Sequence, residues 1–287
     1  MNGIIIVNKE KGYTSRDVVN IVSNIFHTKK VGHTGTLDPI AEGVLVITVG
    51  KCTKLCDYLT SEYKEYIAEF ELGYLTDTLD NTGNKLKESN KIITEEEIKK
   101  TIYSFKGKYN QEVPIYSAVK INGKKLYEYA RNNIEVNLPS REVNIKEIEI
   151  LSMSNKIKIK CLVSKGTYIR SLIRDIGASL GTYATMTNLT RTKSGEFNIE
   201  NSYSINDIKN GNYKLISIEE LFDKYQKINL NNIEYKNISN GNIIDNKYDS
   251  EFVLFYYNNE LISIYKKYEK SKMKPFLMFW SYFFSRK

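Results

Sequence analysis

The residues best placed to do chemistry lie in one short loop, Gly32 to Pro39, which reads GHTGTLDP. The loop carries one carboxylate, Asp38, together with a histidine, two glycines and two threonines. A carboxylate presented by a tight loop can act as a nucleophile. An acid before proline is more often a turn residue, however, and a Gly-rich loop can also cradle a phosphate. Because no Gly-Lys-Ser or Gly-Lys-Thr follows, a P-loop is not supported, and the turn and the nucleophile both stay open.

Two periodic segments could bring partners to this loop. Residues 64–72 alternate between apolar and charged side chains, which predicts a half-buried strand with Tyr66 on its inner face. Residues 167–180 have helical spacing, and Arg170 lies near the start of that helix. Taken singly, Tyr66 is an ordinary core aromatic, Arg170 a surface residue of a helix, and Leu189 a core residue.

The order of motifs along the chain adds more than any single residue does. Five segments stand in sequence: Asn8-Lys9-Glu10-Lys11-Gly12, Val31 to Lys54, Lys64 to Asp80, Gln111 to Tyr127, and Ser164 to Arg191. Together they resemble the TruB family of tRNA pseudouridine synthases, over roughly residues 3–224. A match to five ordered segments is far more specific than a match to one of them.

The resemblance implies an isomerase that converts a uridine in the T-loop of tRNA, position 55 in tRNA numbering, into pseudouridine. The bond between N1 and C1′ breaks, the base turns within its pocket, and C5 bonds to C1′. No redox change occurs, and neither a cofactor nor a metal is expected. The uridine lies inside a folded RNA loop, so it must be flipped out before it can react.

The resemblance also implies roles for individual side chains. Asp38 matches the nucleophile of the family, and Arg170 matches the arginine that pairs with it. Tyr66 matches a tyrosine that packs on the target base and is a candidate for taking the C5 proton. Leu189 matches an apolar residue that lines the base pocket.

The same resemblance implies a second group of residues that act on the RNA. His33 matches a residue that supports the base stack once the uridine has left it. Six other side chains are expected to shape the pocket or bind RNA: Lys9, Lys64, Asp80, Lys165, Tyr168 and Arg191. For the lysines, a solvated position on the surface is the general alternative. An insertion at about residues 107–135 is expected to grip the T-stem-loop.

Charge and composition agree with a polyanionic partner. The chain has 42 Lys and Arg residues against 34 Asp and Glu, a formal net charge of +8. Such an excess suits nucleic acid first and an anionic membrane surface second, although a Lys-rich genome produces it too. The 22 tyrosines can stack on bases and still form hydrogen bonds.

Cysteine content and apolar runs bear on the compartment. Cys52, Cys56 and Cys161 are too few for a disulfide framework, which favours a reducing compartment, and we expect the cytoplasm. The run Ile4 to Val7 is too short for a signal peptide. Residues 276–284 are very apolar but fall short of the ~20 that a membrane helix needs. We expect them to pack on the C-terminal domain, with a partner contact as the alternative. We also expect that the protein is a monomer and that it does not associate with a membrane.

Local patterns predict the elements that position these residues. Strands are expected at 3–8, 44–49, 64–72 and 157–163, and helices at 15–27, 51–60, 95–105, 124–131 and 167–180. Thr14 with Asp17, and Thr94 with Glu97, predict capping boxes. Residues 252–257 and 260–268 flank Asn258-Asn259, which is typical of a tight hairpin.

These elements indicate an α+β protein. With the resemblance, they predict a pseudouridine synthase fold with a mixed, largely antiparallel sheet flanked by helices and loops. The expected domains are a catalytic domain at 1–224 and a small C-terminal β-rich domain of PUA-like type at 225–287.

Two classes of function compete. The first is an enzyme, a tRNA pseudouridine(55) synthase. The second is a non-catalytic tRNA-binding or tRNA-folding protein on the same fold, and a phosphate-binding metabolic enzyme is a distant third. The presence of Asp38, Tyr66 and Arg170 together favours the enzyme, since binding alone would not need all three.

Overall fold

The computed structural model describes residues 2–60 and 63–279. Contacts group the chain into two compact units. The larger consists of Ile5–Ile47 and Leu55–Tyr213, and the smaller of Met1–Ile4, Thr48–Lys54 and Lys214–Lys287. The compact units thus divide between Tyr213 and Lys214, and the domain division at residue 224 stays a prediction.

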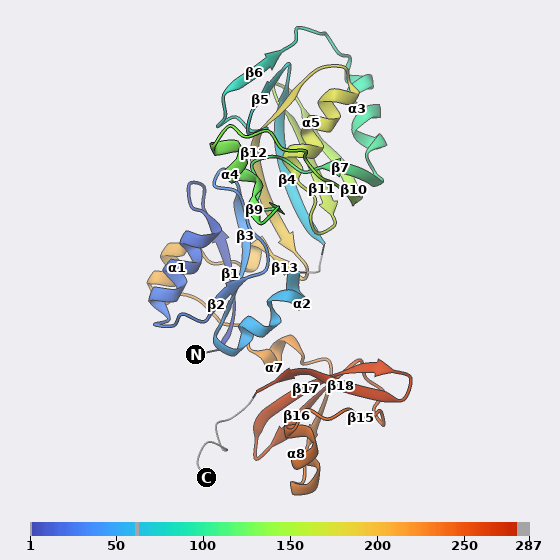
Figure 1. Ribbon diagram of the computed structural model, residues 1–287. Coiled ribbons are helices and arrows are strands. Elements are labelled where there is room, and N and C mark those ends of the chain that lie inside the picture. Colours follow the sequence, from blue (N-terminus) through green and yellow to red (C-terminus); the bar gives the residue numbers. More distant parts are fainter. Residues whose placement is uncertain (1, 61–62, 280–287) are drawn as a thin grey trace. The chain divides into compact units, whose positions relative to one another are not determined.

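A mixed β-sheet forms the framework of the larger unit (Figure 1). Its strands run in the order β1 (Gly3–Lys9), β3 (Glu42–Val49), β12 (Ala184–Ser194), β4 (Lys64–Leu72), β11 (Ile157–Val163), β10 (Ser140–Met153) and β7 (Gly107–Glu112). β2 (Val31–His33) pairs with β3, and β13 (Phe197–Asn198) pairs with β12. β12 is parallel to β3, whereas the pairings from β12 through β4, β11 and β10 to β7 are antiparallel. The predicted mixed, largely antiparallel sheet is confirmed.

The helices begin where the sequence places their caps. α1 (Ser15–Ile25) and α3 (Glu95–Ser104) both start with capping boxes, at Thr14 and Thr94 respectively. α5 (Ile169–Ser179) falls inside the predicted helix at 167–180. The predicted helix at 51–60 is a 3₁₀ turn, η1 (Gly50–Leu55), followed by α2 (Cys56–Thr60). α6 (Ile205–Lys209) is a short element that contacts α1.

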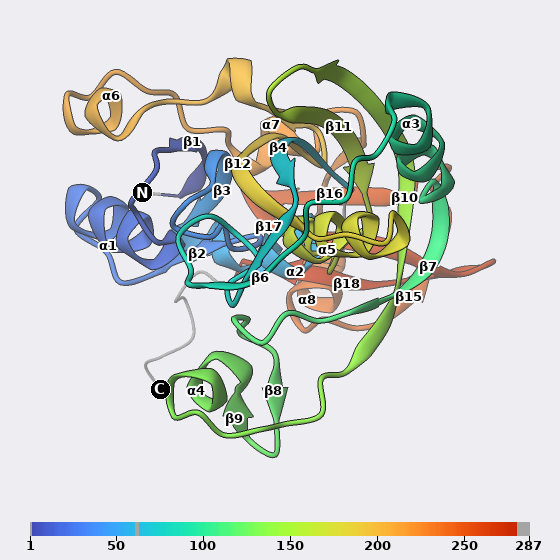
Figure 2. The same cartoon turned by 90° about the horizontal axis from the view of Figure 1, so that it is seen from above.

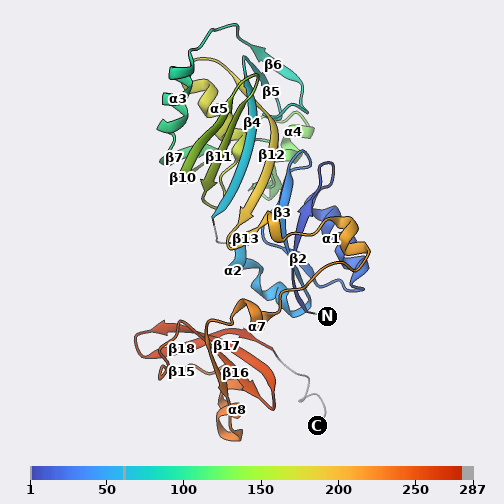
Figure 3. The ribbon, with the colours of Figure 1, turned by 180° about the vertical axis from the view of Figure 1, so that it is seen from behind.

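The core of the larger unit lies between the sheet and α5. α5 contacts β4, β7 and β12, and α3 contacts β10 and α5. Tyr66, Ala68 and Phe70 of β4 are buried in the same apolar cluster as Leu172 and Ile176 of α5. The opposite face of these strands, turned toward the reader in Figure 3, carries ion pairs such as Lys158 with Glu69. Strand periodicity therefore decides that Tyr66 points to the α5 side.

Two long strands, β10 and β12, lie outside the sequence-based predictions. β10 shifts register against β11 between Ile145 and Glu147, and again between Ile150 and Ser152. β12 shifts against β4 between Met186 and Asn188, and between Arg191 and Lys193. Each bulge moves the following side chains to the other face, so the regular alternation that indicates a strand is interrupted.

The segment after β7 stands away from the sheet, as Figure 2 shows for β8, β9 and α4. β8 (Lys120–Ile121) and β9 (Lys124–Lys125) form a hairpin that leads into α4 (Leu126–Arg131). Residues 107–112 are β7 itself, paired with β10, and so belong to the sheet. A second hairpin, β5 (Tyr74–Thr76) with β6 (Lys85–Glu88), follows β4.

The smaller unit contains a five-stranded sheet, so the predicted C-terminal β-rich domain is confirmed. Its strands run in the order β14 (Gln226–Asn229), β16 (Phe252–Tyr257), β17 (Glu260–Glu269), β18 (Lys272–Met278) and β15 (Ile244–Asp245). The unit also contains the short helices α7 (Ile218–Leu221) and α8 (Asn232–Ser239). The predicted hairpin is confirmed, because Asn258 and Asn259 join β16 to β17 with φ of 50° and 61°, as a type I′ turn requires.

The apolar tail begins on this sheet. The rings of Phe276 and Phe252 lie 5.1 Å apart, so the start of the tail packs on the C-terminal unit as expected. Residues 280–284 of the predicted tail lie outside the described residues. Among the described residues, no helix combines the length and the apolar character needed to cross a membrane.

The placement of α5 depends on Gly177. A Cβ at Gly177 would lie 2.6 Å from the backbone nitrogen of Ala184, at the start of β12. Alanine favours helices by about 1 kcal/mol over glycine, so Gly177→Ala would stabilise α5 if space allowed. We predict instead a loss of about 1–3 kcal/mol in the free energy of unfolding, because helix and strand must separate.

Urea denaturation measures this loss. Ser179→Ala, at an exposed position of the same helix, is the matched control and should leave stability nearly unchanged. Equal or greater stability of Gly177→Ala than of wild type would contradict the close packing of α5 on β12.

Candidate active site

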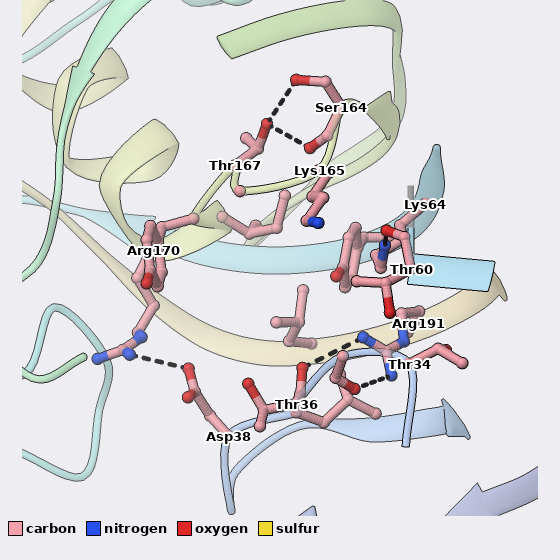
Figure 4. Close-up of a pocket in the computed structure, with 17 residues that line it drawn as sticks. Thr34, Thr36, Asp38, Thr60, Lys64, Ser164, Lys165, Thr167, Arg170 and Arg191 are labelled. Atoms are coloured by element: carbon pink, nitrogen blue, oxygen red, sulfur yellow. Dashed lines mark hydrogen bonds and ion pairs between the residues drawn. The ribbon is translucent and has the colours of Figure 1, made fainter. Parts of the chain in front are cut away.

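The loop that carries Asp38 is held by side chains that bond to its backbone. The Arg191 guanidinium, buried on β12, donates to the carbonyls of Thr36 at 3.2 Å and Gly35 at 3.1 Å. It also donates to the Val44 carbonyl of β3 at 2.6 Å. Figure 4 shows the dashed bonds from Arg191 to this loop. Arg191 thus ties the loop to two neighbouring strands.

Ser15, the first residue of α1, fixes the position next to the carboxylate. Its hydroxyl accepts a hydrogen bond from the Leu37 amide at 2.8 Å and donates to the Leu37 carbonyl at 3.2 Å. The Gly12 amide donates to the Pro39 carbonyl at 2.8 Å. The backbone is therefore anchored at Leu37 and at Pro39, on either side of Asp38, which limits the positions that the Asp38 side chain can reach.

Lys9 supports the first loop, between β1 and α1. Its side chain is fully buried, and its ammonium donates to the carbonyls of Glu10 at 2.9 Å and Tyr13 at 2.7 Å. Burial lowers the pKa of the Lys9 ammonium to about 8, against the attraction of the Asp38 charge, which raises it. Lys9 is thus a structural cation of the first loop, and its ammonium faces backbone carbonyls.

An ion pair joins the loop to α5. Arg170 Nη2 lies 2.9 Å from Asp38 Oδ2, and the dashed line in Figure 4 marks this contact. The Arg170 side chain is 5% exposed, whereas the Asp38 side chain is 41% exposed. The carboxylate is therefore open to a ligand on one side and aimed by a buried cation on the other.

The Arg170 guanidinium has further acceptors from two other segments. Nη1 donates to the Thr78 carbonyl at 2.8 Å and lies 3.8 Å from Asp80 Oδ2. Nη2 also donates to the Tyr116 carbonyl at 3.0 Å, at the root of the projecting segment. Asp80 is buried and accepts from Thr78 Oγ1 and Thr82 Oγ1, so it is itself oriented. Two carboxylates and two carbonyls thus fix one cation.

A cavity of about 240 Å³ opens beside the ion pair. Tyr66 and Leu189, both buried, contribute apolar surface to its lining. Much of the remaining lining comes from the Asp38 loop and from the loop before α5, where Lys165 projects in Figure 4. The volume is below the ~300–1,000 Å³ typical of sites for drug-sized ligands, so the cavity suits one small group.

Most of the residues singled out in the sequence gather at this cavity. Its lining includes Asp38, Lys64, Tyr66, Lys165, Tyr168, Arg170, Leu189 and Arg191. Lys9, His33 and Asp80 are not in the lining, although Asp80 lies beside Arg170, which is. His33 Nδ1 accepts from the Gly35 amide at 3.3 Å, and burial lowers the pKa of its imidazole.

The sequence did not predict individual roles for three groups that position other residues: Ser15, the Tyr116 carbonyl and Gln111. Each acts on a residue more than twenty positions away, and only the motif match around them hinted at a role. Within the described residues, no three or more His, Cys, Asp or Glu side chains cluster as metal ligands would.

Comparison with known proteins bears on the same residues. Residues 23–169 match the profile of the TruB family pseudouridylate synthase N-terminal domain. Residues 170–225 match that of the tRNA pseudouridylate synthase B C-terminal domain. The tRNA pseudouridine synthase B of Clostridium tetani is 47% identical over 84% of this chain and 85% of its own length. That of Fusobacterium nucleatum is 45% identical over 93% of this chain and 100% of its own length.

Two solved structures share the fold. One belongs to an H/ACA RNP bound to a substrate RNA containing 2′-deoxyuridine, with a TM-score of 0.66 and 22% identity over 96% of this chain and 83% of that one. The other belongs to a Cbf5-Nop10-Gar1 complex, with a TM-score of 0.67 and 24% identity over 95% of this chain and 83% of that one. The fold expected from the sequence is therefore confirmed.

The buried ammonium of Lys9 makes stability depend on pH in a defined direction. Folded Lys9 loses its proton near pH 8, whereas the unfolded residue keeps it to about 10.5. Between these values the unfolded chain binds more protons, so stability rises with pH. We predict that wild type gains up to ~3 kcal/mol in the free energy of unfolding relative to Lys9→Met across this window.

Urea denaturation at several pH values measures the difference. Lys11→Met, at an exposed lysine of the same loop, is the control and should follow the wild-type profile. Parallel profiles of wild type and Lys9→Met would show that the ammonium is not perturbed by burial.

Proposed function

The chain belongs to the TruB family of pseudouridylate synthases, and from that premise we propose that it converts uridine 55 in the T-loop of tRNA into pseudouridine. The observation that carries the proposal is the ion pair of Asp38 with buried Arg170, at 2.9 Å, beside a cavity lined by Tyr66 and Leu189. A protein that only bound RNA would not need a half-exposed carboxylate aimed by a buried cation.

Asp38 acts as the nucleophile of the reaction. Its carboxylate adds to C6 of the base or to C1′ of the ribose, or it assists departure of the base through a glycal-like intermediate. All three routes need an oriented carboxylate next to the nucleoside, and the 41% exposure of Asp38 lets a substrate reach it. The anchored Leu37 and Pro39 backbones keep that orientation before the substrate arrives.

The reaction is balanced without an external reagent. The bond from N1 to C1′ breaks, the base turns, and a bond from C5 to C1′ forms. The proton on C5 leaves and a proton is taken up at N1, so the product has the same composition as the substrate. Tyr66, whose ring lines the cavity, is the group that we assign to contact the base and take the C5 proton.

The remaining lining residues hold the base while it turns. Leu189 offers an apolar surface that tolerates rotation of the ring, because dispersion contacts have no direction. Arg170 moderates the charge on Asp38 during bond formation and bond breaking, since a fixed cation needs no reorganisation as charge shifts. Lys165, exposed at the cavity, adds positive charge that suits the phosphates beside the flipped nucleotide, whereas Lys64 is buried and donates to the Thr60 carbonyl at 3.4 Å.

The projecting segment of β8, β9 and α4 is the part that we assign to the T-stem-loop. Lys120, Lys124 and Arg131 are exposed there, and Arg131 lies 5.3 Å from the ring of Tyr127. Exposed cations beside aromatic rings suit a backbone of phosphates with unstacked bases. His33 precedes Asp38 in the same loop, and its imidazole accepts a hydrogen bond from the Gly35 amide. We propose that it supports the base stack that the flipped uridine leaves.

We further propose that the protein works as a monomer in the cytoplasm. Every residue that lines the cavity comes from one chain and from the larger unit, so no second copy is needed to complete the site. Three cysteines are too few for a disulfide framework, which suits a reducing compartment.

Removal of the nucleophile tests the proposal directly. We predict that wild type releases tritium from [5-³H]uridine-labelled tRNA, because the C5 hydrogen is lost. Asp38→Asn should lower the rate by at least about 10³-fold while tRNA binding, measured by filter retention, changes less than about threefold. Asp57→Asn, at an exposed position of α2 away from the cavity, is the matched control.

Other outcomes separate the alternatives. Wild-type protein that binds tRNA without releasing tritium would establish a non-catalytic binding or folding protein. Tritium release by Asp38→Asn at the wild-type rate would overturn the assignment of the nucleophile and leave the activity standing.

The projecting segment makes a separate prediction about salt. Lys120→Gln with Lys124→Gln should weaken tRNA binding and lower the slope of log affinity against log salt, by about 0.7–0.9 for each phosphate that the variant no longer neutralises. The rate of the bound complex should stay close to wild type, because neither lysine lines the cavity. Lys100→Gln with Lys209→Gln, at two exposed positions on α3 and α6, is the control pair. An unchanged slope would place the RNA elsewhere.

A further inference from the structure

Gln111 is a fully buried amide at the end of β7, in the segment expected to grip RNA. Its Nε2 donates to the Tyr168 carbonyl at 3.1 Å, and its Oε1 accepts from the Tyr168 amide at 2.8 Å. Nε2 also donates to the Tyr109 hydroxyl at 2.6 Å. Gln111 is 0% exposed and is not in the cavity lining, so it contacts the protein rather than RNA.

The Gln111 side chain bonds to both backbone groups of Tyr168, as the backbone of a neighbouring β-strand would. A glutamine amide presents one donor and one acceptor side by side, and Tyr168 presents the complementary pair. Tyr168 is the N-cap of α5, and its own side chain makes no capping hydrogen bond. The amide of Gln111 therefore fixes the residue from which α5 begins.

Arg170 stands two residues after this fixed point, inside the first turn of α5. The adjoining residue of β7, Glu112, holds the first two turns of α5. Ser171 Oγ donates to the Glu112 carbonyl at 2.9 Å, and Arg174 pairs with the Glu112 carboxylate at 3.0 Å. The Tyr109 hydroxyl, which accepts from Gln111, in turn donates to the Asp175 carboxylate of α5 at 3.4 Å. The end of β7 thus grips one face of α5 on both sides of Arg170.

We propose that Gln111 is a positioning residue for catalysis, which sets the start of α5 so that the Arg170 guanidinium meets Asp38. The inference rests on the proposed function, since it assigns Gln111 to the reaction at that site. Without the amide, the first turn of α5 frays, and Arg170 keeps its charge but loses its alignment with the carboxylate. A misplacement of about 1 Å in such a constellation can cost about a hundredfold in rate.

The first test replaces the amide by an apolar side chain of similar length. Gln111→Met should lower kcat for tritium release by about ten- to a hundredfold, with the affinity for tRNA nearly unchanged. A loss of kcat without a loss of binding separates positioning from unfolding, which removes both in proportion. Circular dichroism and urea denaturation give the folded fraction of each sample.

The second test uses pH to restore the bonding pattern. In Gln111→Glu, a protonated carboxyl can donate to the Tyr168 carbonyl and accept from its amide, whereas the carboxylate can only accept. Burial favours the neutral carboxyl, so the activity of Gln111→Glu relative to wild type should rise as pH falls from about 8.5 to 6. The same ratio for Gln111→Met should be flat, because methionine does not titrate. Gln226→Glu, the same change at an exposed position of β14, should match wild type throughout.

The third test asks whether Gln111 acts through Arg170. In a background of Arg170→Lys, which keeps the charge but lacks the forked donors, Gln111→Met should cost less than about threefold. Full additivity of the two losses would overturn the proposal, because Gln111 would then act independently of Arg170.

The outcomes distinguish this inference from the activity itself. Absence of tritium release by wild type would refute the proposed function. With wild type active, a Gln111→Met variant of wild-type kcat would refute the positioning role alone. Proportional loss of kcat, tRNA binding and folded fraction, with a pH-independent ratio for Gln111→Glu, would reduce Gln111 to a structural residue and would also refute it.

Discussion

The burial of one guanidinium constrains the arrangement of the whole site. A charged side chain that is 5% exposed is costly unless opposite charge and hydrogen-bond acceptors surround it. Arg170 meets this requirement with Asp38, Asp80 and two backbone carbonyls, which come from the loop after β2, the loop after β5 and the root of the projecting segment. These three segments are far apart in the chain, and each must reach the same point for the cation to be satisfied. The burial of Arg170 therefore fixes the relative positions of these three segments around the Asp38 carboxylate.

A second layer of contacts explains how loops can hold a reactive group in place. Side chains that bond to backbone atoms of the loops have this role: Arg191 and Ser15 on the Asp38 loop, Lys9 on the loop before it, and Gln111 on the start of α5. Two of these residues, Lys9 and Arg191, were expected to shape the pocket or bind RNA, yet their hydrogen bonds run to the protein backbone. Backbone atoms make sound anchors because their positions do not depend on rotamers, so the Asp38 carboxylate is oriented before any ligand binds.

Charge is divided between these inner contacts and the outer surface. Inside, Lys9, Arg170 and Arg191 are buried and matched with acceptors, so they contribute little to attraction at a distance. Outside, the exposed lysines and arginine of the projecting segment, and Lys165 at the cavity, carry the positive charge that a polyanion meets. The net charge of +8 is thus a poor guide to individual contacts, because it counts both groups alike.

Sequence alone determined the features that depend on near neighbours. The strands at 64–72 and 157–163, the capping boxes at Thr14 and Thr94, and the Asn258-Asn259 hairpin follow from periods of two to four residues and from local turn chemistry. The ordered motifs identified the family, and they marked Asp38, Tyr66, Arg170 and Leu189 as one group. Only the tertiary structure decided that Lys9 and Arg191 face the protein, that Asp80 and Tyr116 complete the shell of Arg170, and that Gln111 holds α5. Such contacts join residues dozens of positions apart, and the register that sets them passes through bulges in β10 and β12 that no local period records.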